Sequence, residues 1–157
     1  MRAWLLLQHR IPTEPSAGRV AVWRKMKRLG GFLLQDATWV LPATPWTREQ
    51  LQWLAAEIVE LGGEARVWEA EVTIGEDETL VTHFQTQVNA AFADILTALG
   101  HEDADLATLA RRYQQARTVD YFHSELGEQV RAALSSTKPS TPSSAPTLIS
   151  RTSRRRT

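Results

Sequence analysis

Two Gly-Gly pairs constrain the fold of this chain more than any other feature, because each ends a helical pattern at a fixed place. Gly30-Gly31 follows such a pattern over residues 16–29, and Gly62-Gly63 follows a second over residues 47–61. Apolar, strand-like runs fill the intervals, at residues 4–11, 32–35, 38–41 and 64–72. The predicted order is therefore β-α-β-β-α-β, a ferredoxin-like arrangement of the α+β class with both helices on one face of an antiparallel sheet.

The starts of the two helices carry residues that are typical of caps. Ser16 is expected to cap the first helix, and Thr47 to cap the second, with Gln50 completing a capping box three residues later. Trp46 would then precede the cap and staple the second helix. The tryptophans within predicted elements are interpreted as core residues: Trp4, Trp23, Trp39, Trp53 and Trp68.

The remainder of the chain divides into a helical part and a tail. Apolar residues recur at helical spacing over residues 79–99 and 103–119, and a last helix holds Leu126, Val130 and Leu134. The final segment is rich in Ser, Thr and Pro and cannot bury enough apolar surface to offset its ordering entropy. We therefore predict a ferredoxin-like domain at residues 1–74, a helical extension at 75–134 and a disordered tail at 135–157.

The formal net charge is zero, but charge is distributed unevenly along the 157 residues. Residues 1–48 hold eight basic and two acidic residues, whereas residues 49–134 hold five basic and sixteen acidic residues. The last 23 residues hold five basic residues and no acid. Because a basic segment attracts anionic partners, the front of the chain favours nucleic-acid binding.

The first predicted helix carries five cations: Arg24, Lys25, Lys27 and Arg28 on the arc opposite its apolar side, and Arg19 near the seam. Like charges on one arc repel one another unless an anion lies nearby. Two interpretations remain open. The arc is a solvated helix face, or it contacts nucleic-acid phosphates and gains affinity by counterion release. Arg10 and Arg48 could extend the patch, but no motif for reading bases is present.

No pattern in the sequence predicts catalysis, a metal site or a cofactor. Cysteine is absent, which excludes a thiol nucleophile and fits a reducing, cytoplasmic compartment. The four histidines show no HxH or HExxH spacing, and no Walker, GxGxxG or GxSxG motif occurs. Asp36 is interpreted as a hairpin residue that bonds its local backbone. The apolar run near the start is too short for a signal peptide or a membrane span.

Three segments together resemble the N-terminal domain of the ChrB family, regulators associated with bacterial chromate-resistance operons. They are "WLLLQHRIPTEPSAGRVAVWRKMKRLGGFLLQDATWVLP", "REQLQWLAAEIVELGGEARVWEAE" and "LARRYQQARTVDYF", within roughly residues 3–134. The resemblance implies a DNA-binding transcriptional regulator of a chromate efflux operon. The DNA-contacting element would be the basic helix, with Arg19, Arg24, Lys25, Lys27 and Arg28. A homodimer on duplex DNA is expected, because two-fold symmetry suits palindromic operators.

Family members continue into a second domain thought to sense chromate, whereas this chain enters its Ser/Pro/Arg tail. Chromate is therefore expected to act through a separate or missing domain, and the short chain is interpreted as a truncated, split or frameshifted member.

The same layout also resembles CRISPR-associated ferredoxin-like nucleases and the middle domain of PaaX-type repressors. The nucleases carry a metal-binding aspartate at the end of the first strand, where this chain has Gln8-His9-Arg10. A hard Mg²⁺ ion is poorly held without carboxylates, so no enzymatic activity is expected. The alternative function is a protein-interaction or nuclease-like module without catalytic carboxylates.

Overall fold

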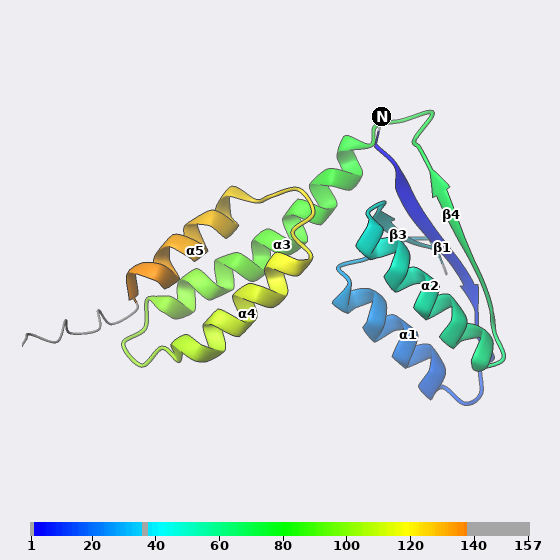
Figure 1. Ribbon diagram of the computed structural model, residues 1–157, viewed down its shortest axis with the longest axis horizontal. Coiled ribbons are helices and arrows are strands. Elements are labelled where there is room, and N and C mark those ends of the chain that lie inside the picture. The colour runs from blue at the N-terminus through cyan, green and yellow to red at the C-terminus, as the bar shows by residue number, and fades with distance from the viewer. Residues whose placement is uncertain (1, 36–37, 138–157) are drawn as a thin grey trace, which may run out of the picture.

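The computed structural model describes residues 2–35 and 38–137 (Figure 1). This part of the chain forms β1 (Trp4–Arg10), α1 (Ala17–Arg28), β2 (Phe32–Gln35), β3 (Thr38–Pro42), α2 (Pro45–Glu60), β4 (Glu64–Ala70), α3 (Glu78–Leu99), α4 (Leu106–Thr118) and α5 (Glu125–Thr137). The strands form one antiparallel sheet in the order β2-β3-β1-β4. The predicted α+β class is confirmed, and the first six elements follow the predicted order.

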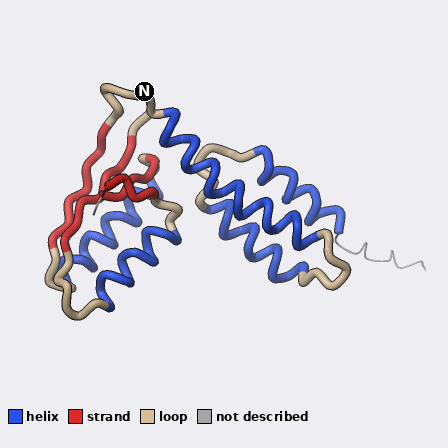
Figure 2. Tube along the Cα trace, turned by 180° about the vertical axis from the view of Figure 1, so that it is seen from behind, coloured by secondary structure: helices blue, strands red, loops and turns tan. Residues whose placement is uncertain are grey.

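The central strand β1 pairs with β3 on one side and with β4 on the other. Because successive strand side chains point to opposite faces, Leu5, Leu7 and His9 share one face of the sheet. Helices α1 and α2 both cover this face, as the views from opposite sides show (Figures 1 and 2). The core on this side joins the sheet to five buried helix residues: Val22, Met26, Leu51, Leu54 and Ile58.

The link from α1 to β2 explains the first Gly-Gly pair. Gly30 has a φ of +73°, the left-handed conformation that favours glycine after a helix. A Cβ on Gly31 would lie 2.8 Å from the terminal methyl of Met26, so a side chain there would displace the core. Ser16 precedes α1 as predicted, but its side chain makes no capping hydrogen bond, because its backbone is already helical, at φ −65° and ψ −19°.

The predicted cap of α2 is wrong. The helix begins at Pro45, and its cap is Thr44, whose hydroxyl accepts the Thr47 amide at 3.1 Å. The Thr44 amide donates in return to the Thr47 hydroxyl at 2.9 Å, so the capping box joins these two residues and does not involve Gln50. Proline suits the first helical position because no N–H is needed there. Trp46 therefore lies in the first turn and is not a staple before the cap.

The helices α3, α4 and α5 pack on one another around a second core, which includes Phe92, Ile95 and Tyr113. The start of α3 lies against the sheet, where Phe84 stacks on Trp4 with ring centroids 5.8 Å apart. Helix α5 extends to Thr137 and includes the first three residues of the segment predicted as a tail. Residues 138–157, and with them the rest of that prediction, lie outside the described residues. None of the described helices is long and apolar enough to cross a membrane.

Two of the five tryptophans expected in the core are buried, namely Trp4 and Trp39. The other three are wrongly predicted, with exposed fractions of 52% for Trp23, 64% for Trp53 and 51% for Trp68. Trp68 pairs with Leu6 across the strands and therefore lies on the face opposite α1 and α2. Trp23 and Trp53 lie on exposed sides of α1 and α2.

Candidate nucleic-acid interface

Helix α1 holds all five predicted nucleic-acid-binding residues on its exposed sides. Its buried positions are Gly18, Val22 and Met26, which pack against the sheet. Because these positions recur every four residues, they fix the orientation of the whole helix. The side chains of Arg19, Arg24, Lys27 and Arg28 are exposed as a result, and Lys25 is half-buried.

Ion pairing separates the cations of α1 from half of the other described cations. Four arginines elsewhere have carboxylate partners within 4 Å: Arg2 with Asp77 and Glu78, Arg10 with Glu64, Arg48 with Glu69, and Arg131 with Glu128. Among residues 2–35 and 38–137, no α1 cation has such a partner. The helix itself contains no acidic residue. Its positive charge is therefore not locally neutralised.

Arg10 and Arg48, which the sequence suggested as extensions of this patch, each have a carboxylate partner. Arg48 donates to Glu69 at 2.6 and 3.2 Å, and Arg10 lies 3.7 Å from Glu64. These exposed pairs contribute little to stability, about 0–1 kcal/mol each. Each pair nevertheless places a carboxylate beside the cation, which disfavours a phosphate at the same position.

Helix α4 is a second cationic element, which the sequence reasoning missed. It carries Arg111, Arg112 and Arg117, contains no acid, and makes no ion pair within the described part of the chain. The available signal was the acid-free stretch "LARRYQQAR" inside an otherwise acidic half. The large acidic excess of residues 49–134 as a whole hides this local basic stretch.

The end of α1 lies beside the end of α4. A Cβ on Gly30 would lie 3.0 Å from the Cβ of Val119, the residue after α4. Lys27 of α1 and Ala116 of α4 line the same small cavity of about 150 Å³. The fold thus brings together the C-terminal ends of two cationic helices that are more than 75 residues apart in the sequence (Figure 1).

The helix dipole offers a partial structural explanation for the charge on α1. Lys25, Lys27 and Arg28 lie in the last turn, where cations interact favourably with the C-terminal carbonyl groups. The Lys27 ammonium also lies 5.6 Å from the centroid of the Trp23 ring, a cation–π contact. These effects do not reach Arg19, which is in the first turn, so they account for only part of the cluster.

The described histidines and carboxylates do not form a metal centre. Within residues 2–35 and 38–137, no three His, Asp or Glu side chains are placed to hold a metal ion. Asp36, interpreted from the sequence as a hairpin residue, lies outside the described residues. The predicted absence of catalysis and of a metal stays a prediction.

Comparison with known proteins shows one family. The profile of the family described as "Protein ChrB, N-terminal" matches residues 19–117, from α1 into α4, and so includes both cationic helices. A curated relative, "Protein ChrB" of Cupriavidus metallidurans, is 30% identical over 139 residues. The match covers 78% of this chain and 41% of the relative, so the chain spans about two fifths of that protein. No solved structure matches the chain significantly.

Proposed function

The chain belongs to the ChrB N-terminal family, and on that premise we propose that it is a DNA-binding transcriptional regulator associated with chromate resistance. It would control a chromate efflux operon in the cytoplasm. One observation carries the proposal: eight cations on α1 and α4 have no carboxylate within 4 Å in the described structure.

These eight cations would contact the phosphate backbone of duplex DNA. Lys and Arg gain affinity there by releasing condensed counterions, and the gain does not depend on base sequence. Phosphate contacts also fix the register of a protein on DNA, but sequence is read elsewhere, in the grooves or through DNA shape. The eight cations would therefore supply affinity, and other groups would read the operator sequence.

We also propose that the sheet with α1 and α2 is a ferredoxin-like domain. The element order β-α-β-β-α-β and the antiparallel strand order β2-β3-β1-β4 support this assignment. A homodimer would place two copies of α1 on the two halves of a palindromic operator. Chromate would act through the part of the family protein that the match does not reach, since the match covers 41% of the relative.

An electrophoretic mobility shift with the upstream region of the protein's own operon tests DNA binding. Reversing Arg24, Lys25 and Arg28 to Glu should abolish the shift. Arg131→Glu is the matched control, because Arg131 is an exposed arginine on α5 that is paired with Glu128. Unchanged binding by the triple variant would refute the role of α1, and no binding by the wild type at low salt would refute the proposed function.

A protein-interaction module is the second candidate, favoured by exposed apolar residues on α2. Trp53 is 64% exposed and Val59 is 60% exposed. A partner that covers the Trp53 indole would remove this large apolar surface from water. This candidate would be favoured if the wild-type protein does not shift DNA but binds a specific partner protein in a pull-down. The Trp53→Ser variant tests the role of this side chain, because it should no longer bind that partner.

A further inference from the structure

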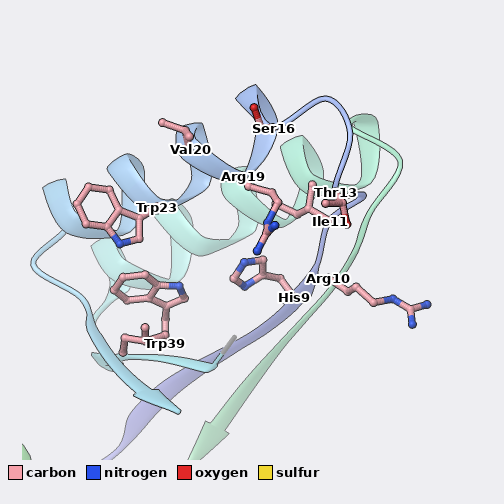
Figure 3. Close-up of a pocket in the computed structure, with 10 residues that line it drawn as sticks. His9, Arg10, Ile11, Thr13, Ser16, Arg19, Val20, Trp23 and Trp39 are labelled. Carbon is pink, nitrogen blue, oxygen red and sulfur yellow. The ribbon is translucent and has the colours of Figure 1, made fainter. Parts of the chain in front are cut away.

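A groove lies between α1 and the sheet, beside the cationic arc. Its volume is about 610 Å³, within the usual range for small-molecule sites. The side chains that line it come from the end of β1, from α1 and from strands β2 and β3. Figure 3 shows Trp23 of α1 above Trp39 of β3, with Arg19 pointing from the helix toward His9. The groove thus combines two indole rings with the guanidinium of Arg19 and the imidazole of His9.

The apolar walls of the groove are unusually exposed. Val20 is 44% exposed, Trp23 is 52% exposed and Leu33 is 41% exposed, although all three belong to ordered elements. Removing apolar surface from water is favourable by about 25 cal/mol per Å². A ligand with an apolar body would cover these three side chains together, because they line one hollow.

The charge in the groove comes from Arg19. Among residues 2–35 and 38–137, its guanidinium has no carboxylate within 4 Å. A planar guanidinium binds carboxylates and phosphates through two parallel hydrogen bonds. Arg10 also borders the groove, but Figure 3 shows its side chain pointing away, and it pairs with Glu64. The anionic end of a ligand would therefore meet Arg19.

The size and the lining of the groove select among anions. A bare oxyanion such as phosphate would satisfy Arg19 and leave the indole of Trp23 and the side chains of Val20 and Leu33 in water. A planar aromatic anion would pair its charge with Arg19 and stack its ring on Trp23. We propose that this groove is a binding site for small aromatic carboxylates, which shares Arg19 with the surface that would contact DNA phosphates.

Isothermal titration of the full-length protein with naphthalene carboxylate tests the proposal. Binding should weaken about tenfold or more with the uncharged naphthalene carboxamide, because one charge-assisted contact is lost. Arg19→Gln should lose about as much for the same reason. Arg66→Gln is the matched control, because Arg66 is also exposed and without a described ion pair but lies on β4, paired with Gln8. It should bind like the wild type.

Trp23→Leu separates stacking from charge. Trp23 is half-exposed, so α1 should keep its structure in this variant, which circular dichroism would verify. The variant should bind naphthalene carboxylate several-fold more weakly. Inorganic phosphate that binds as tightly as the carboxylate would show that only charge is recognised and would overturn the proposal. So would the absence of carboxylate binding to the wild type, or equal losses in the Arg19 and Arg66 variants.

Discussion

The dependence of DNA binding on salt gives the sharpest test of the cationic surface. For duplex DNA, the logarithm of the binding constant falls against the logarithm of salt concentration with a slope of about −0.9 per neutralised phosphate. Eight cations without described carboxylate partners lie on α1 and α4. If each contacts one phosphate, one protomer should show a slope of about −7.

The two helices can be tested separately. Replacing the five α1 cations by Gln should reduce the slope by about 4.5, and replacing the three α4 arginines should reduce it by about 2.7. Arg48→Gln serves as the control and should change the slope little, because Arg48 is already paired with Glu69 at 2.6 Å. Fluorescence anisotropy with a labelled operator duplex, measured at several salt concentrations, gives each slope directly.

Two results would refute this reasoning. A wild-type slope near zero would mean that binding does not release counterions, whatever the affinity. An equal reduction in the Arg48 variant and in the α1 variant would mean that ion pairing does not distinguish the cations. A change confined to α1 would instead restrict the interface to that helix and remove α4 from it.

Three further predictions concern stability. Tyr121→Phe should cost about 1 kcal/mol at neutral pH, because the Tyr121 hydroxyl donates to the Leu29 carbonyl at 2.6 Å. Burial raises the pKa of Tyr121, so the folded state holds this proton more tightly than the unfolded state does. Wild-type stability should therefore fall as pH rises above about 10. Thermal melts between pH 8 and 11 should show a flatter decline in the variant. Thr47→Val should cost about 1–3 kcal/mol in urea unfolding, because the buried hydroxyl completes the capping box of α2. Gly63→Ala should cost about 1–3 kcal/mol in the same assay, because the new Cβ would lie 2.4 Å from the Arg10 carbonyl oxygen; equal stability would mean that the backbone shifts freely there.

The order of elements was predictable because glycine and proline act locally. Gly30 and Gly62 both have positive φ values, the left-handed conformation that favours glycine after a helix, so both pairs end their helices for a local reason. The cap of α2 was not predictable in the same way. Thr44 and Thr47 are both good cap residues, and the choice depends on Pro45 and on the Thr47 hydroxyl, which donates to Pro42 at 2.6 Å. That last contact is set by where β3 ends.

The positions of the tryptophans and of the second cationic helix needed the structure. A helical wheel shows on which face of its helix Trp53 lies. It does not show whether another element covers that face. The three arginines of α4 belong to a half with a large acidic excess, and their proximity to α1 arises from a contact between Gly30 and Val119. Arg48 shows the converse, because its charge is cancelled by Glu69 across the sheet-helix boundary.

Arg19 belongs both to the cationic cluster of α1 and to the groove, and this sharing predicts linkage. A carboxylate paired with Arg19 removes one cation from the DNA surface, so saturating naphthalene carboxylate should reduce the salt slope of DNA binding by about 0.9. If the lost phosphate contact is worth about 1 kcal/mol, DNA affinity should fall about fivefold. Binding free energies are reciprocal, so saturating operator DNA should weaken the carboxylate by the same factor. Both changes should vanish in Arg19→Gln. Carboxylate binding that DNA leaves unchanged would mean that Arg19 serves the groove alone, and the phosphate contacts of α1 would then number four.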